Sequence, residues 1–178
     1  MTDIDINRRT FIKASFALAG AFVLGKISEL FPTPAISASS RMFPSDTKKY
    51  HNARYGFSFL YPRDLAVRTF DEGGGAATIT VQNIEKAQGF QIFVTPYEGT
   101  QVSAQRFKQD VPSGVRESLT PVKVDGATGA AFLSKNAALG ATREVWFTHG
   151  GFLYEVTTLA PLDAWLDGIM QSWRFLAP

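Results

Sequence analysis

The chain contains no cysteine and only two histidines among its 178 residues, and these absences exclude several kinds of chemistry. Without cysteine there is no disulfide scaffold, thiol nucleophile, lipidated N-terminal cysteine, iron–sulfur cluster or covalently attached haem. The two histidines, His51 and His149, stand about a hundred residues apart, whereas zinc sites usually take histidine or cysteine at short spacing. The sequence therefore predicts no metal site and no cofactor.

Neither sign of charge is in clear excess, because the chain has 18 Lys and Arg residues and 16 Asp and Glu residues. It also has no run of basic residues. Nucleic-acid binding relies on clustered basic residues, so the composition argues against a nucleic-acid partner. Hydrophobic residues make up 45% of the chain, which is too many for a disordered protein. The length allows one domain with a short appendage.

The hydrophobic run near the N-terminus is short for a membrane-spanning helix. Residues 14–25 give twelve uncharged residues between Lys13 and Lys26, whereas a spanning helix needs about 20 apolar residues. The run fits the hydrophobic region of a signal peptide. An amphipathic surface helix would show a polar stripe, which this run lacks. An uncleaved anchor stays open as an alternative if residues 27–36 extend the hydrophobic stretch.

The residues before this run resemble the bacterial twin-arginine export signal. Arg8 and Arg9 are paired, Phe11 is the second residue after them, and Lys13 follows two residues later, with Ile12 where Leu is commonest. The motif predicts that the chain folds before it crosses the membrane, with the twin-arginine translocase as its partner during export. The expected location is periplasmic or extracellular, with membrane contact only through the N-terminal segment if that segment is retained.

The expected organisation of the chain has three parts. A signal peptide covers residues 1–38, because small residues offer cleavage points after Ser37 or Ala38. A polar, Pro-containing linker covers residues 39–49. The folded domain covers residues 50–178, and the chain after the signal peptide is nearly neutral, with 14 basic and 13 acidic residues.

Strand-length segments of β-branched and aromatic residues, bounded by turn residues, fill most of the domain. In the first of them, Phe57, Phe59 and Tyr61 lie on one face, which is the period-2 pattern of a half-buried strand. We expect strands at residues 56–62, 65–70, 77–84, 89–95, 115–124, 127–133, 143–148 and 152–159.

Two helices are expected beside these strands. Ser103 can cap the first, Val102 and Phe107 can form a hydrophobic staple, and residues 112–114 end it. The second begins near Pro161 and carries an apolar stripe that should cover the sheet. The stripe comprises Leu162, Trp165, Leu166, Ile169, Met170 and Trp173. The sequence thus predicts one α+β domain.

The element order and the aromatic residues resemble the PsbP-like family over residues 50–177. The resemblance rests on residues 55–62 (YGFSFLYP), on residues 152–158 (FLYEVTT) and on residues 172–175 (SWRF). It implies an α+β fold in which helices flank a central antiparallel β-sheet, an αβα sandwich. Family members are mostly non-enzymatic, and include lumenal photosystem II extrinsic and assembly proteins, a Ran-binding relative, and bacterial secreted proteins or lipoproteins. The chain departs from the photosystem members by lacking a plant-type transit peptide. Its export motif starts only seven residues in, which suggests a prokaryote.

Few residues suggest chemistry. The stretch His149-Gly150-Gly151 matches part of the oxyanion hole of some lipases and esterases. That chemistry needs a Gly-x-Ser-x-Gly turn, which the chain lacks, so a β-hairpin turn is the simpler interpretation. Glu144 and Glu155 alternate with apolar neighbours, and we expect both to be solvated charges rather than an acid–base pair. Asp71 and the residue after it lack the alternating acids of a calcium loop.

No catalytic constellation stands out, so we assign no catalytic residue and expect a non-catalytic protein. The sequence favours an exported binding or assembly module of the cell envelope, with an unidentified envelope protein as its partner. The alternative is a small secreted hydrolase with a site around His149 and Glu144 or Glu155. A photosystem II-associated lumenal protein is a third hypothesis, and it rests on the family resemblance.

Overall fold

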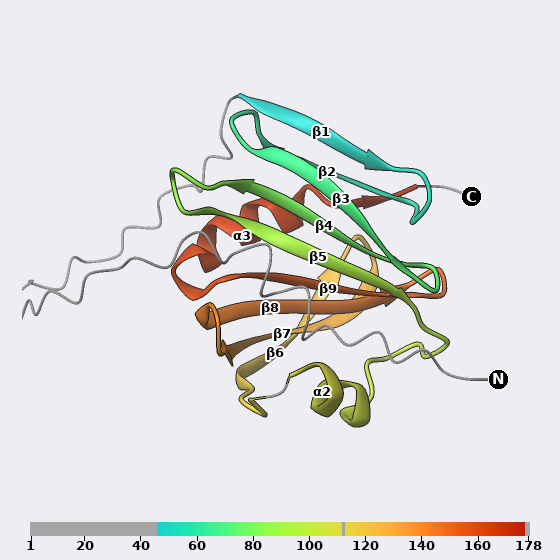
Figure 1. The fold of residues 1–178 in the computed structure, drawn as a ribbon. Coiled ribbons are helices and arrows are strands. Elements are labelled where there is room, and N and C mark those ends of the chain that lie inside the picture. The colour runs from blue at the N-terminus through green and yellow to red at the C-terminus, as the bar shows by residue number, and fades with distance from the viewer. Residues whose placement is uncertain (1–45, 112, 177–178) are drawn as a thin grey trace, which may run out of the picture.

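Ten antiparallel strands form two sheets in the part of the chain that the computed structural model describes, residues 46–111 and 113–176 (Figure 1). The larger sheet has the order β3–β4–β5–β9–β8–β7–β6, and the smaller has the order β1–β2–β10. The strands of the larger sheet are β3 Ala66–Gly73, β4 Ala76–Asn83, β5 Gln88–Pro96, β6 Glu117–Val124, β7 Ala127–Asn136, β8 Gly140–His149 and β9 Phe152–Leu159. Those of the smaller sheet are β1 Thr47–Asn52, β2 Phe57–Pro62 and β10 Arg174–Phe175.

Short helical elements follow β5 and β9. Helix α2 spans Ala104–Asp110, while the 3-10 turn η1 at Ala160–Leu162 leads into helix α3 at Asp163–Gln171. The predicted cap of α2 is confirmed, because the backbone N–H of Arg106 donates to the Ser103 hydroxyl at 3.1 Å. Within the described residues, none of the helices has the length and apolar character needed to cross a membrane.

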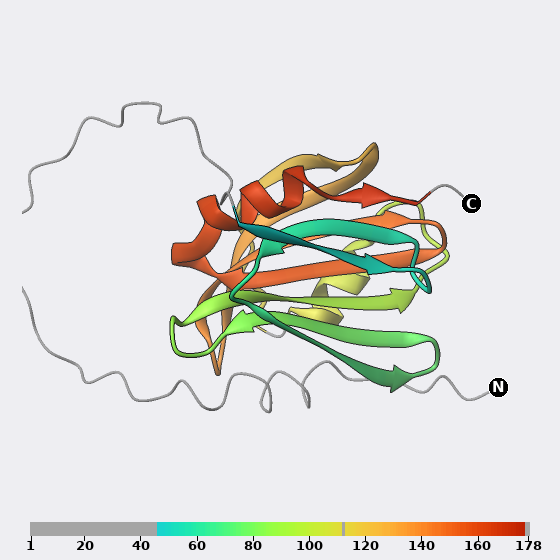
Figure 2. The ribbon, with the colours of Figure 1, turned by 90° about the horizontal axis from the view of Figure 1, so that it is seen from above.

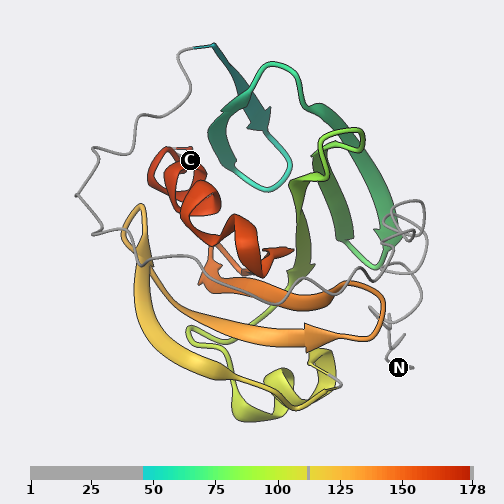
Figure 3. The same ribbon diagram turned by 90° about the vertical axis from the view of Figure 1, so that its left-hand side faces the viewer.

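The predicted α+β sandwich, with helices flanking a central antiparallel sheet, is wrong in its layers. Strands hold 58% of the described residues and helices only 15%. One face of the larger sheet packs against the smaller sheet together with α3, and the other face carries α2 (Figures 2 and 3). The smaller sheet gains its third strand because the chain returns to β2 after α3, where Arg174 pairs with Ser58. A second sheet therefore stands where a layer of helices was expected.

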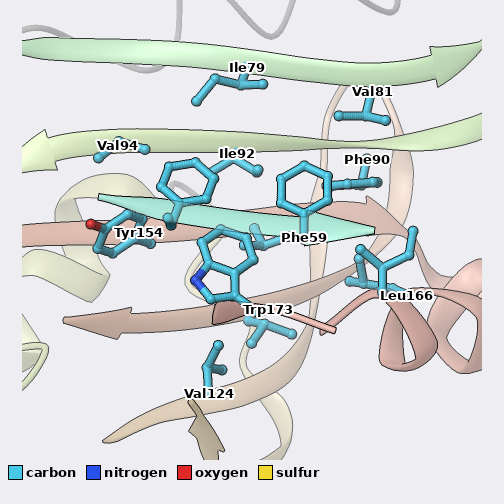
Figure 4. Packing of buried hydrophobic residues seen from close by; sticks show 14 of the residues in the cluster. Phe59, Ile79, Val81, Phe90, Ile92, Val94, Val124, Tyr154, Leu166 and Trp173 are labelled. Atoms are coloured by element: carbon cyan, nitrogen blue, oxygen red, sulfur yellow. The ribbon is translucent and has the colours of Figure 1, made fainter. Parts of the chain in front are cut away.

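The main core lies between the two sheets and α3 (Figure 4). Alternate residues of the central strands point into it, and Ile79 and Val81 of β4 and Phe90 of β5 are completely buried. Phe57 of β2 stacks on Trp173, with ring centroids 4.4 Å apart and planes 9° apart. Aromatic side chains bury large apolar areas, so this stack ties the smaller sheet to the segment that follows α3.

The apolar stripe of the last helix is confirmed only in part. Leu166 and Ile169 of α3 are buried in the core. Trp165 is only half-buried, whereas Trp173, which follows the helix, is completely buried. The main aromatic anchor of this region therefore belongs to the connection between α3 and β10.

Each predicted strand exists, but the ends of the domain differ from the expectation. Strand β1 begins at Thr47, three residues before the expected start of the domain. Strand β10 was not predicted, because two residues are too few to show a strand period. These two strands flank β2, so the parts of the chain that sequence patterns did not reveal are the ones that build the smaller sheet.

Candidate functional site

The His149-Gly150-Gly151 stretch is the turn of the β8–β9 hairpin, as predicted. Gly150 and Gly151 both have positive φ angles, 58° and 81°, which glycine adopts without strain. The imidazole of His149 stacks on Phe175 of β10, with ring centroids 3.6 Å apart. The turn therefore helps to attach the end of the chain, and its histidine ring lies against an aromatic ring.

The structure does not bring His149 together with Glu144 or Glu155. Side chains alternate between the two faces of a strand, so Glu144 and His149 of β8 point to opposite faces. Trp146 of β8 lies opposite Glu155 of β9 and packs against α2, which places both glutamates on the α2 face. Phe175, against which His149 stacks, packs on the other side. The residues proposed for a hydrolase site are therefore separated by the sheet.

Glu144 is buried, so the prediction that it is a solvated charge is wrong. Only 5% of its surface is exposed. Its Oε1 accepts a hydrogen bond from the Thr142 hydroxyl at 3.0 Å. Its Oε2 accepts from the Trp146 indole N–H at 3.1 Å and from the Thr157 hydroxyl at 2.7 Å. The carboxylate thus joins β8 to β9 as a structural acceptor, which is how a buried charge is compensated.

Glu155 is also buried, with no exposed surface, and the same prediction is wrong for it. Arg106 of α2 reaches the sheet and places its Nη2 3.5 Å from Glu155 Oε1. The same guanidinium forms an ion pair with Asp110, one turn further along the helix. These charges fasten α2 to the sheet. Only the four-residue spacing of Arg106 and Asp110 could have indicated this from the sequence.

An aromatic cluster lies beside these charges and explains why the glutamates are covered. Phe107 of α2 stacks on Trp146, with centroids 4.9 Å apart, and contacts Phe132 of β7 edge-on at 5.4 Å. Val102 and Val111, at the two ends of α2, pack against the same rings. Alternation within β8 and β9 could not reveal this cover, because it comes from a helix more than 30 residues away in the chain.

Two further polar groups are buried on the α2 face of the sheet. Thr80 of β4 lies opposite Gln91 of β5, which in turn lies opposite Thr157. The Thr80 hydroxyl oxygen and the Gln91 side-chain oxygen have no hydrogen-bond partner among the described residues. Burying a polar atom without a partner costs free energy, so this row is a weak point in the packing of the face.

The other residues considered from the sequence also have structural surroundings. Asp71, at the β3–β4 turn, accepts a hydrogen bond from the Gly73 backbone N–H at 2.8 Å and pairs with Arg54 at 3.2 Å. The backbone hydrogen bond and then Arg54 lower the pKa of this carboxyl. Burial raises the pKa of the Tyr154 phenol, which donates to the Tyr55 carbonyl at 2.7 Å. Across residues 46–111 and 113–176, no group of three His, Asp or Glu side chains could hold a metal ion.

The predicted export signal, Arg8, Arg9, Phe11 and Lys13, lies outside the described residues. The predicted cleavage points at residues 37 and 38 lie outside them as well.

Comparison with models of known protein families gives no match. Over 60 residues the chain is 35% identical to Shewanella-like protein phosphatase 2 of Arabidopsis thaliana, which corresponds to 34% of this chain and spans only 15% of that protein's length. A solved structure from Bacteroides thetaiotaomicron is similar with a TM-score of 0.43 and 13% identity, over 73% of this chain and 48% of that chain.

The solution structure of cyanobacterial PsbP (CyanoP) from Synechocystis sp. PCC 6803 is also similar. It has a TM-score of 0.50 and 15% sequence identity, over 79% of this chain and 98% of the cyanobacterial chain. At this identity the likeness concerns the fold. The described residues therefore adopt a PsbP-like fold.

Proposed function

We propose that this chain is an exported, non-catalytic extrinsic protein that binds the outer surface of a membrane-protein complex, as photosystem II-associated PsbP proteins do. The observation that carries the proposal is the fold likeness to cyanobacterial PsbP, which spans nearly the whole of that protein. The extrinsic role comes from the family resemblance seen in the aromatic segments of the sequence. This extrinsic role is a more specific form of the binding or assembly module of the envelope that the sequence favours.

The polar groups considered for catalysis are engaged in packing, which favours a non-catalytic role. The carboxylate of Glu144 is buried and accepts three hydrogen bonds from side chains of β8 and β9. Arg106 and Glu155 fasten α2 to the sheet, and His149 stacks on an aromatic ring. A catalytic site needs a nucleophile or base within hydrogen-bond reach of a second functional group in an accessible pocket. These residues serve the packing of the domain.

The export step is part of the same proposal. Arg8 and Arg9 would direct the folded chain to the twin-arginine translocase, and release by cleavage near residue 38 would leave the PsbP-like domain outside the cytoplasm. Replacing both arginines by lysine should keep the chain in the cytoplasm. Replacing Lys26 by arginine, outside the motif, should leave export unchanged. Export of the double variant at the normal level would contradict the signal assignment.

Membrane fractionation of the producing cells tests the extrinsic role. The protein should sediment with the membranes and be released by concentrated sodium chloride, because contacts between exposed charges weaken in salt. An integral anchor would instead require detergent. A protein that stays wholly in the soluble fraction at low salt would overturn the extrinsic role, and phosphate ester hydrolysis by the purified chain would favour an enzyme.

A further inference from the structure

A groove of about 450 Å³ lies on the solvent side of the smaller sheet, beside the end of α3. Its floor and walls combine two hydroxyl groups, an exposed leucine and two cations, and no carboxylate of the described residues lines it. Its lining includes Lys49, Ser58, Leu60, Gln171, Ser172 and Arg174. All of them lie in well-defined strands or at the end of α3, so the groove is a feature of the folded domain.

The register of the smaller sheet explains why these side chains meet. Lys49 of β1 lies opposite Leu60 of β2, and Arg174 of β10 lies opposite Ser58 of β2. The intervening Phe59 points into the core, so Ser58 and Leu60 lie on the opposite face of β2, where Ser58 is covered and Leu60 is exposed. The two cations therefore flank the outer face of β2 from opposite sides.

Arg174 is held in place by the end of α3. Its Nη1 donates to the carbonyl oxygens of Gln171, at 3.0 Å, and Trp173, at 2.5 Å. A guanidinium carries five N–H groups, and its Nε and Nη2 make no hydrogen bond to any described residue. This pair of nitrogens matches the two oxygens of a carboxylate. The side chain is thus oriented before any ligand arrives.

The remaining residues extend this site along the groove. The Ser172 hydroxyl accepts from the Leu60 backbone N–H at 2.9 Å and donates to the Ile169 carbonyl at 2.6 Å, which holds the β2 edge against α3. Leu60 itself is 36% exposed and is one of the few large hydrophobic side chains at the described surface. Lys49 makes no ion pair with a described residue. An apolar contact therefore lies between two cationic ones.

We propose that this groove binds an acidic, extended segment of a partner protein. A carboxylate of the segment would pair with the Nε–Nη2 edge of Arg174, an apolar side chain would cover Leu60, and a second carboxylate would face Lys49. This inference rests on the proposed function, because it names the surface through which the extrinsic protein would dock. Charge complementarity favours this occupant, since two cations and no carboxylate of residues 46–111 and 113–176 line the groove.

A polypeptide fits the groove better than a lipid surface does. Cations that bind anionic bilayers act on a flat array of headgroups, and a basic cluster of several residues is needed for appreciable binding. Here the cations border a hollow, with an apolar residue between them. In an extended chain every second side chain points to the same face, so acidic, apolar and acidic side chains at positions i, i+2 and i+4 match that arrangement.

Nuclear magnetic resonance titration of the purified full chain tests the proposal. The probe is a short acetylated peptide with the pattern Glu-Ser-Leu-Ser-Glu, which puts both Glu and the Leu on one face of an extended chain, compared with the same peptide carrying Gln for every Glu. The acidic peptide should shift the amide signals of Ser58, Leu60 and Ser172 and the Nε–H signal of Arg174. The Gln peptide should leave them in place.

Three variants distinguish a built site from general attraction of charges. Arg174→Lys keeps the charge but loses the paired Nε and Nη2 donors of the guanidinium. It should weaken binding of the acidic peptide about tenfold. Lys49→Gln should weaken it about threefold. The matched control, Lys123→Gln on the exposed face of β6, makes the same change away from the groove and should have an effect below about twofold. The Lys49 side chain makes no hydrogen bond or ion pair with a described residue, so its variant remains informative if the Arg174 variant is unstable.

Several results would overturn the proposal. They are absence of shifts in the groove, equal binding of the Gln peptide, or equal weakening by Lys49→Gln and Lys123→Gln. Tighter binding of inorganic phosphate or of phosphatidylglycerol vesicles at the same residues would also overturn it, in favour of a phosphate or lipid ligand. The titration tests the groove in purified protein, whereas the fractionation tests the extrinsic role in cells. If the protein is released from membranes by salt but does not bind the peptide, the extrinsic role is retained and only the proposal for the groove is refuted.

Discussion

Replacement of Glu144 tests whether its buried carboxylate holds β8 and β9 together. The Trp146 indole can only donate a hydrogen bond, whereas the hydroxyls of Thr142 and Thr157 can rotate. In Glu144→Gln the amide oxygen can still accept from Trp146 and Thr157, and its NH2 group can donate to Thr142. In Glu144→Leu the indole N–H loses its acceptor. The two variants therefore separate hydrogen bonding from charge.

The expected magnitudes follow from this difference. Glu144→Gln loses charge assistance, and its free energy of unfolding should fall by about 1 kcal/mol. Glu144→Leu leaves a buried donor unsatisfied and loses the charge-assisted bonds of the hydroxyls, so its free energy of unfolding should fall by about 3 kcal/mol. Both changes remove the desolvation cost of a buried charge, which offsets part of the loss.

Urea titration followed by tryptophan fluorescence measures both effects. Glu117, exposed on β6, provides the matched control, and its replacement by Gln or Leu should change the free energy of unfolding by less than about 0.5 kcal/mol. The slope of the titration should stay constant, because the folded state remains compact. If Glu144→Leu were as stable as Glu144→Gln, or more stable than the parent, desolvation would outweigh the hydrogen bonds and the reasoning would be refuted.

Three further predictions concern other parts of the fold. Trp173→Ala should lower the free energy of unfolding by about 4 kcal/mol in thermal or urea unfolding. Trp165→Ala should lower it by less than half as much, because Trp165 is only half-buried. Equal losses would contradict the assignment of Trp173 to the core. Thr80→Val should raise the midpoint of urea unfolding, because a buried hydroxyl with no partner in the described part of the chain is replaced by a methyl group of the same shape. A lower midpoint would show that the hydroxyl has a hydrogen-bond partner. The lowered pKa of Asp71 gives stability that is present above the carboxyl's unfolded pKa and is lost as the pH falls through the folded value. Asp71→Asn should therefore flatten the acid side of the stability–pH profile, and an unchanged profile would exclude a contribution from this carboxyl.

Sequence periodicity predicted the core strands because their pattern is local. Apolar residues alternate with polar ones in β4, at Ile79 and Val81, and in β5, at Phe90 and Ile92. All four are completely buried, as that pattern indicates. The cap at Ser103 was predictable for the same reason, since a helix start depends on a few neighbouring residues. Local patterns were therefore sufficient wherever the structure depends on local interactions.

The failures concern contacts between distant parts of the chain. Alternation placed Glu144 and Glu155 opposite the apolar face, but could not show that α2 covers them. The layers were wrong for the same reason, because β2 and β10 stand more than 100 residues apart and neither reveals the other. The groove was missed as well, since Lys49 and Arg174 come from opposite ends of the domain.

The pairing of β2 with β10 has a consequence for the order in which the domain assembles. More than 100 residues separate the two strands in the chain. Closing so long a loop costs conformational entropy, and the contacts of the intervening hairpins must first offset that cost. The stack of Phe57 on Trp173 should therefore form late in folding, after the larger sheet has paired.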